Sequence, residues 1–171
     1  MNIRIGNGYD VHALAEGLPL WLGGVQVESP IGCIAHSDGD VAIHALCDAL
    51  LGALALGDIG KHFPDTSDEF AGIDSKILLK RVIELVRSKG WTVGNVDITI
   101  AMQRPKLAPY IIPMRECMAS VMDIDTDCVS TCRAPRVLPP PSSSGHAPAH
   151  WRRSCDRPTR EHPARPSSNR P

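Results

Sequence analysis

The chain has 171 residues, enough for one domain with a hydrophobic core, and its formal net charge is −1. This small charge conceals two unlike segments, because residues 1–130 carry 10 Lys and Arg against 17 Asp and Glu, whereas residues 131–171 carry 8 Arg against 2 acidic residues. The acidic body argues against nucleic-acid binding, which needs clustered basic side chains, and no apolar run reaches the roughly 20 residues of a membrane span.

Two strands are predicted in the first 30 residues. The segment Ile3–His12 has the composition of a strand that soon opens, and its glycines allow a close approach of the backbone to a neighbour. A second strand signal covers Leu20–Val27, within which Gly23 and Gly24 mark a turn or a bulge.

Three helices are predicted where apolar residues recur at helical spacing, over residues 41–54, 75–89 and 111–122. Asp38 and Asp40 precede the first helix and are typical helix-capping residues. Between the first two helices lies a loop, residues 57–68, that is rich in specific polar groups.

Alternation at Val96–Ile100 predicts a third strand. The order of these elements predicts the α/β class: an α+β sandwich in which a mixed sheet carries helices on one face.

The six cysteines form no Cys-x-x-Cys pair, and no secretory leader precedes them. We therefore expect reduced thiols and a cytoplasmic protein. Cys33 and Cys47 are expected to be core thiols, the commoner fate of a buried cysteine.

Three residues predict a metal site. Asp10 and His12 are two apart, so both side chains point to one face of an extended segment, and His44 falls in the first turns of the first helix. One oxygen and two nitrogens suit Zn²⁺ with an open fourth position, the arrangement of a catalytic site. A histidine near a helix start can equally be a cap or a surface group. Asp48, four residues after His44, either orients a ligand or lies on a solvated helix face.

Four motifs carry a resemblance to a known family. They are Gly-Tyr-Asp-Val-His at 8–12, Ala-His-Ser-Asp-Gly-Asp-Val-Ala-Ile-His at 35–44, Gly-Asp-Ile-Gly-Lys-His-Phe-Pro-Asp-Thr at 57–66 and Asn-Val-Asp-Ile-Thr-Ile at 95–100. In order and spacing, residues 3–130 closely resemble the 2-C-methyl-D-erythritol 2,4-cyclodiphosphate synthases of non-mevalonate isoprenoid biosynthesis. The resemblance implies a ferredoxin-like fold derived from βαβ units, and a homotrimer with active sites between subunits.

The resemblance also implies an activity and its cofactors. The family cyclises 4-diphosphocytidyl-2-C-methyl-D-erythritol 2-phosphate: the 2-phosphate attacks the β-phosphorus and CMP leaves. It is a metal-dependent phosphorus–oxygen lyase with one Zn²⁺ per subunit and a second divalent cation, Mg²⁺ or Mn²⁺.

By the same resemblance, Asp10, His12 and His44 fall on the zinc ligands, and His36 falls on the residue that stabilises the transition state. The implied substrate contacts are Asp10, Val11, His12, His36, Ser37, Asp58, Ile59, Gly60, Phe63, Pro64, Asp65, Thr66, Ser67, Met102, Gln103, Arg104, Pro105, Lys106, Leu107 and Ala108. Met102–Ala108 are contributed in the family by the adjacent subunit.

The chain departs from the family after Ser130. The family continues with Lys-Ala-Thr-Thr-Thr-Glu and later Gly-Phe-Thr-Gly-Arg, and this chain has neither motif. Residues 131–171 contain 9 Pro, 8 Arg and 6 Ser, so we expect a disordered segment after a synthase domain at 1–130 that lacks its last strands. A frameshift near codon 131 would produce this change. In the family these motifs supply threonines that contact the cytidyl diphosphate, a glutamate that binds the second cation and an arginine that contacts the phosphate. Because this chain lacks them, we expect little activity.

Two other classes of function remain open. The chain could be a non-catalytic zinc- or nucleotide-binding module whose arginine-rich segment binds acidic partners or RNA. A fragment of a bifunctional enzyme is a third possibility, although nothing within the chain resembles a fused cytidylyltransferase.

Overall fold

The computed structural model describes residues 2–64 and 72–134. Contacts divide the chain into a compact unit, Met1–Val137, and a second unit, Leu138–Pro171, which lies outside the described residues. The first unit contains, in order, β1 (Leu14–Glu16), β2 (Leu20–Leu22), β3 (Val25–Val27), β4 (Ile31–Cys33), α1 (Val41–Ala53), α2 (Ile59–His62), α3 (Ser75–Ser88), β5 (Val96–Ala101), η2 (Ala108–Tyr110), α4 (Ile111–Met122), η3 (Thr126–Cys128) and β6 (Val129–Ala134).

The three predicted helices are confirmed as α1, α3 and α4. Asp40 caps α1 by accepting from the N–H groups of Ala42 and Ile43, and Asp74 caps α3 by accepting from Lys76. Helix α3 packs against both α1 and α4, so the helices form one continuous body.

Within the second strand signal, the glycine pair is a turn. Strands β2 and β3 pair antiparallel, and Gly23 and Gly24 between them have φ values of +58° and +79°. Two consecutive positive φ angles are typical of the tight hairpin turn that matches strand twist, which explains why both positions are glycine. The remaining short strands, β1 and β4, also pair antiparallel.

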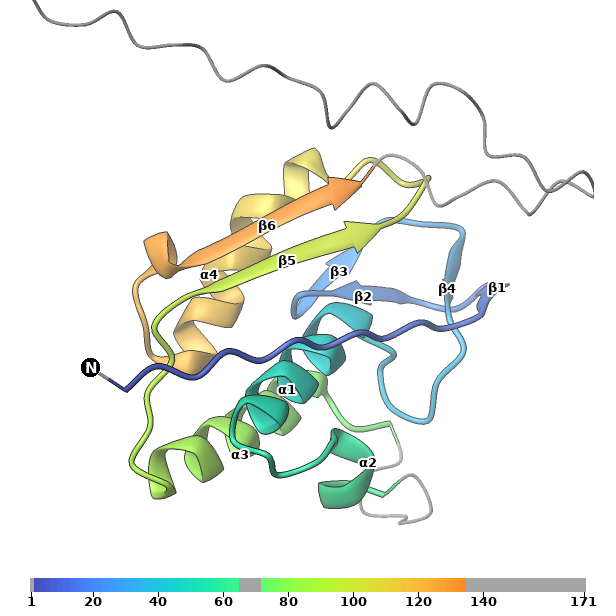
Figure 1. The fold of residues 1–171 in the computed structure, drawn as a ribbon. Coiled ribbons are helices and arrows are strands. Elements are labelled where there is room, and N and C mark those ends of the chain that lie inside the picture. The colour runs from blue at the N-terminus through green and yellow to red at the C-terminus, as the bar shows by residue number, and fades with distance from the viewer. Residues whose placement is uncertain (1, 65–71, 135–171) are drawn as a thin grey trace, which may run out of the picture. The chain divides into compact units, whose positions relative to one another are not determined.

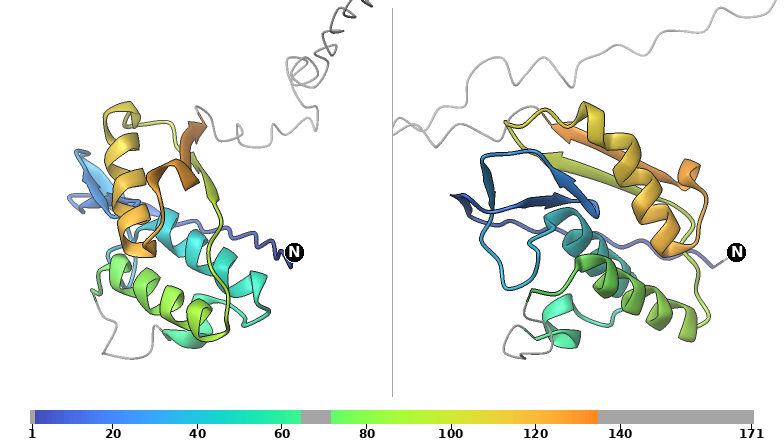
Figure 2. Two further views of the ribbon diagram at one scale, coloured as in Figure 1. Left: turned by 90° about the vertical axis from the view of Figure 1, so that its left-hand side faces the viewer. Right: turned by 180° about the vertical axis from the view of Figure 1, so that it is seen from behind.

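The predicted strand at Ile3–His12 is wrong, because strand structure in this part of the chain begins only at Leu14. The segment is extended but makes no ladder with any described strand. It crosses in front of α1, between that helix and β5 (Figures 1 and 2). The expected single mixed sheet is accordingly found as three two-stranded sheets, two antiparallel and one parallel.

Strands β5 and β6 are parallel and are connected through α4, which makes them a βαβ unit as the resemblance implies. The register runs from Val96 opposite Val129 to Ala101 opposite Ala134. Strand β6 therefore continues past the boundary predicted after Ser130. The rest of the segment predicted to be disordered, residues 135–171, lies outside the described residues.

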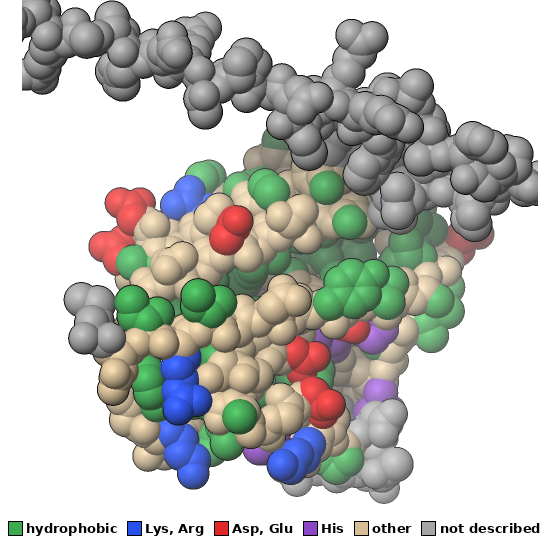
Figure 3. All heavy atoms as spheres, viewed as in Figure 1, with side chains coloured by type: hydrophobic (Ala, Val, Ile, Leu, Met, Phe, Trp, Pro, Cys, Tyr) green, Lys and Arg blue, Asp and Glu red, His purple; other side chains and the backbone are tan. Residues whose placement is uncertain are grey.

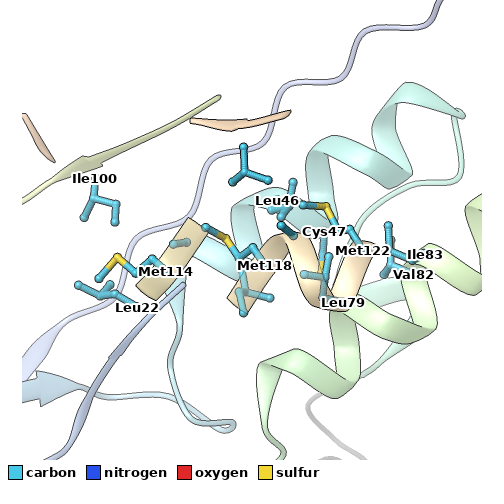
Figure 4. Packing of buried hydrophobic residues seen from close by; sticks show 14 of the residues in the cluster. Leu22, Leu46, Cys47, Leu79, Val82, Ile83, Ile100, Met114, Met118 and Met122 are labelled. Atoms are coloured by element: carbon cyan, nitrogen blue, oxygen red, sulfur yellow. The ribbon is translucent and has the colours of Figure 1, made fainter. Parts of the chain in front are cut away.

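Methionine and branched aliphatic side chains from both halves of the unit fill the core (Figure 4). Its members include Leu22, Leu46, Cys47, Leu79, Val82, Ile83, Ile100, Met114, Met118 and Met122. Cys47 is completely buried among them, as predicted. In the part of the chain that the structure describes, no helix is both long and apolar enough to span a membrane.

Candidate metal centre

The N-terminal segment lies on α1 through its even-numbered positions. Arg4 donates to the carbonyl oxygen of Ala53, and a Cβ added at Gly6 or Gly8 would overlap the helix backbone at Ala49 or Ala45. Only glycine permits so close an approach. The next even positions, Asp10 and His12, consequently face α1, while the odd positions point away.

Helix α1 contributes His44, which lies one turn after the N-cap Asp40. The imidazole is only 6% exposed, and its backbone N–H donates to the carbonyl oxygen of Asp40. Asp40 itself is fully buried and accepts four backbone N–H groups, those of Gly23, Gly24, Ala42 and Ile43. The carboxylate thus joins the β2–β3 turn to the helix that carries His44.

Asp10, His12 and His44 converge on one point, as predicted. Asp10 Oδ2 lies 3.2 Å from His12 Nε2 and 3.1 Å from His44 Nδ1, and the two nitrogens are 3.4 Å apart. Ligand atoms about 2.0–2.1 Å from a tetrahedral Zn²⁺ lie about 3.3 Å from one another. The three atoms therefore fit three corners of such a site, and among the described residues no fourth His, Cys, Asp or Glu joins them.

The charges of the cluster favour an ionised Asp10. Burial alone would raise the pKa of this carboxyl group, but the hydrogen bond to His44 and the positive character of both histidines hold its pKa below the usual range. An ionised carboxylate beside two imidazoles is the donor set that a divalent cation requires. Figure 3 shows histidine and acidic side chains together on this face.

The second imidazole nitrogen of His44 faces two hydroxyl groups. Nε2 lies 2.9 Å from Ser75 Oγ and 3.2 Å from Ser37 Oγ. Asp38 accepts from both the hydroxyl and the backbone N–H of Ser75, at 2.5 and 2.9 Å. Asp38, predicted as a cap of the first helix, therefore binds the start of α3.

The polar loop after α1 forms the short helix α2, which sequence periodicity did not indicate. Asp58 caps it by accepting from Lys61 N–H, and Asp48 on α1 accepts from Ile59 N–H at 2.8 Å. Asp48 therefore ties this loop to α1. This role differs from both predicted roles, which were orienting a metal ligand and lying on a solvated helix face.

His36 lies in the loop before α1. Its carbonyl oxygen accepts from Gly72 N–H, and the residue is exposed.

The other substrate-binding residues that the resemblance implies differ in solvent exposure. Gly60 and Pro64 are exposed and Phe63 is half-buried, whereas Asp65, Thr66 and Ser67 lie outside the described residues. Val11, on the odd face of the N-terminal segment, is 70% exposed.

The loop Met102–Ala108 follows β5, and its hydrogen bonds join it to β6 and α4 rather than to the metal cluster. Arg133 on β6 donates to the carbonyl oxygens of Met102 and Gln103. Leu107 is completely buried in the core, so it can offer a substrate only its backbone. Arg104, Lys106 and Ala108 are exposed.

Comparison with known proteins places the chain in a family. The sequence model of the YgbB family matches residues 3–133. The chain belongs to this family. The 2-C-methyl-D-erythritol 2,4-cyclodiphosphate synthase of Azotobacter vinelandii is 58% identical over 128 residues, which are 75% of this chain and 82% of that enzyme. The synthase of Bacteroides thetaiotaomicron is 55% identical over 130 residues, 76% of this chain and 82% of the relative.

Solved structures of the YgbB family have the same fold. A synthase structure with bound CDP aligns with a TM-score of 0.73 at 41% identity, covering 76% of this chain and 87% of that one. The bifunctional IspDF of Campylobacter jejuni aligns with a TM-score of 0.74 at 42% identity, covering 77% of this chain and 36% of that one. The α/β class predicted from the sequence is confirmed.

Proposed function

We propose that the folded unit is the catalytic scaffold of a 2-C-methyl-D-erythritol 2,4-cyclodiphosphate synthase and that Asp10, His12 and His44 hold its Zn²⁺. Membership of the YgbB family supports the activity, and the mutual distances of 3.1–3.4 Å among the three donor atoms support the metal site. This convergence of three donor atoms on one point is the observation that carries the proposal.

In this reaction the protein has to position the substrate and stabilise the negative charge that develops on the phosphates. A 2-phosphate oxygen of the 4-diphosphocytidyl-2-C-methyl-D-erythritol 2-phosphate attacks the β-phosphorus, the bond to the α-phosphate oxygen breaks, and CMP leaves. A divalent cation held by the cluster would withdraw negative charge from the phosphate oxygens. Because His44 is buried and its helix is anchored by Asp40, the ligand nitrogen stays fixed while substrate enters from the exposed side.

We propose that the remaining substrate contacts come from two subunits, as the family resemblance implies. Ile59 at the start of α2 is tied to Asp48 on α1, the helix that carries His44, and Asp58 caps α2. The loop Met102–Ala108 is instead anchored to β6 and α4. The family resemblance implies a homotrimer, and we propose that in it this loop reaches the metal centre of a neighbour and that His36 and Ser37 contact the phosphates.

The chain as written is proposed to be impaired. The family match ends at residue 133, and the second cation, Mg²⁺ or Mn²⁺, would need the glutamate of the motif that the chain lacks. Loss of one donor of this type costs on the order of 10²-fold in rate. The described cysteines are all free thiols, which supports a reducing, cytoplasmic location.

CMP release in Zn²⁺ and Mg²⁺ tests the proposal. The purified chain should release CMP at least about 10²-fold more slowly than a version in which the reading frame after Ser130 is restored. Activity of the restored protein should disappear with His44→Ala. An inactive restored protein, or one indifferent to His44→Ala, would exclude the synthase assignment; normal turnover by the chain as written would exclude the impairment. The alternative, a non-catalytic zinc module with a basic segment, is not favoured by the family match.

A further inference from the structure

We infer that Asp38 and Ser75 act as positioning residues that keep a proton on Nε2 of His44, so that Nδ1, which faces Asp10 and His12, is the nitrogen available to a metal ion. The inference rests on the proposed metal site. A chain of three hydrogen-bonded side chains supports the inference. They are the carboxylate of Asp38, the hydroxyl of Ser75 at the start of α3, and the imidazole of His44 on α1.

The direction of the hydrogen bonds follows from Asp38. Its Oδ1 receives the backbone N–H of Asp40 at 3.1 Å and the hydroxyl of Ser75 at 2.5 Å, and its Oδ2 receives the backbone N–H of Ser75 at 2.9 Å. Three donors converge on this carboxylate, which as an anion can only accept. The single proton of the Ser75 hydroxyl is therefore committed to Asp38.

This hydrogen bond determines which imidazole nitrogen of His44 carries a proton. Because the Ser75 hydroxyl donates its hydrogen bond to Asp38, Oγ can only accept a hydrogen bond from the imidazole nitrogen 2.9 Å away. Nε2 must then carry a proton, which leaves Nδ1 as the nitrogen that can give up its proton to bind a metal ion. Nδ1 is the nitrogen that lies 3.1 Å from Asp10 and 3.4 Å from His12.

The hydroxyl of Ser75 is not needed to build α3. Asp74 caps the helix through Lys76 N–H, and the backbone N–H of Ser75 already binds Asp38. Yet the Ser75 side chain is fully buried and aimed at the imidazole. Ser37 is the competing partner, but it lies farther from Nε2 and already accepts from Gly39 N–H. Partners of this kind fix the orientation of metal-bound histidines, and losing one weakens metal affinity by roughly 10–100-fold.

Two readouts test the inference. In ¹⁵N-histidine NMR of the metal-free protein, the Nε2 of His44 should be protonated in the parent. In titrations with Co²⁺, followed by its visible absorption, Ser75→Ala should bind roughly 10–100-fold more weakly. Ser88→Ala is the matched control, because its hydroxyl donates to the Leu85 carbonyl oxygen at the far end of α3. It should bind Co²⁺ as the parent does.

Asp38→Asn provides a second variant should Ser75→Ala fold poorly. An amide directed at Ser75 can donate to its hydroxyl, which frees the hydroxyl proton for Nε2 and moves the ring proton to Nδ1. Co²⁺ affinity should fall and the NMR signature should reverse. An unprotonated Nε2 in the parent, or unchanged Co²⁺ affinity in both variants, would overturn the inference. A parent that binds no Co²⁺ would refute the proposed metal site, and the NMR measurement would still decide the protonation of Nε2.

Discussion

Thr131 on β6 has a buried hydroxyl group whose hydrogen bonding is unsatisfied within the described part of the chain. It is 8% exposed, and among the described residues its Oγ1 has no hydrogen-bond partner. A buried hydroxyl without a partner costs about 1–3 kcal/mol. Thr131→Val has the same shape and removes the cost, so we expect about 1 kcal/mol more stability in urea unfolding. Thr99→Val on β5 is the control, because its hydroxyl is exposed and paired with Cys132 Sγ. Equal effects of the two substitutions would contradict this account.

The cysteines should differ sharply in reactivity. Burial raises the pKa of the Cys47 thiol far above its usual value, and the nearby carboxylates of Asp48 and Asp40 add to the rise. Cys132 is exposed on β6. With an aromatic disulfide at neutral pH, we expect Cys132 to be modified promptly and Cys47 only when the protein unfolds, as located by peptide mass spectrometry. Modification of Cys47 in the native state at the rate of Cys132 would show that the core is open.

At the scale of the element, the packing of the N-terminal segment on α1 determines the metal site. Gly8→Ala would place a Cβ into the Ala45 carbonyl oxygen, so the segment must move off the helix and carry Asp10 and His12 away from His44. We expect Co²⁺ affinity to fall by at least about tenfold, the effect of a ligand that loses its orientation.

Gly52→Ala is the matched control for Gly8→Ala. A Cβ at Gly52 on α1 meets nothing within 4 Å, so this substitution should leave Co²⁺ affinity unchanged and raise stability by up to about 1 kcal/mol. If Gly8→Ala bound Co²⁺ as tightly as Gly52→Ala, the close approach would have no part in building the site.

Asp48 joins α1 to α2 and should make stability depend on pH. Burial is the main cause that raises its pKa above the ordinary 3.8, so the folded protein holds the proton more firmly than the unfolded chain. The charged form therefore destabilises the fold at neutral pH, and this penalty is relieved as the pH falls through the raised pKa towards 3.8.

Asp48→Asn keeps an acceptor for Ile59 N–H and removes the buried charge. We expect it to be more stable than the parent in unfolding experiments at about pH 7, with the difference shrinking as the pH is lowered. Asp48→Ala removes the acceptor as well and should be less stable than Asp48→Asn at every pH. A constant difference between Asp48→Asn and the parent would show that the charge is not the cause.

Elements whose periodicity comes from a buried face could be predicted from sequence. Helices α1, α3 and α4 and strand β5 have such faces, and the Asp10, His12 and His44 cluster followed from spacing and resemblance together. The two-residue spacing of Asp10 and His12 predicted the correct facing of their side chains, but the strand predicted at Ile3–His12 was wrong, because a strand needs a partner that local sequence does not specify. Ser75 was missed for a related reason: its hydroxyl matters only through residues distant in the sequence.

At the scale of the whole molecule, the odd-numbered face of the N-terminal segment is unpaired. Ile3, Ile5, Tyr9 and Val11 are 70–90% exposed, and Figure 3 shows hydrophobic side chains in the hollow beside this segment. A stripe of large apolar residues along an extended backbone without ladder bonds is typical of a surface that another strand or subunit covers. The family motifs that this chain lacks would follow Ser130 on β6, so the proposed trimer would lack the residues that could cover this stripe.

Replacing residues 131–171 by the matching C-terminal segment of the Azotobacter vinelandii relative should therefore restore assembly. We expect this chimera to sediment as a trimer and the parent chain as a smaller species, because the stripe is then covered. Ile5→Asp should dissociate the chimera, since a charge buried at that position lacks a partner, and should leave the parent chain unaffected because Ile5 is 90% exposed there. Ile77→Asp, at a 47% exposed position on α3, is the control and should leave the trimer intact. A parent chain that already forms a trimer, or a chimera whose trimer tolerates Ile5→Asp, would mean that the stripe is not the surface on which assembly depends.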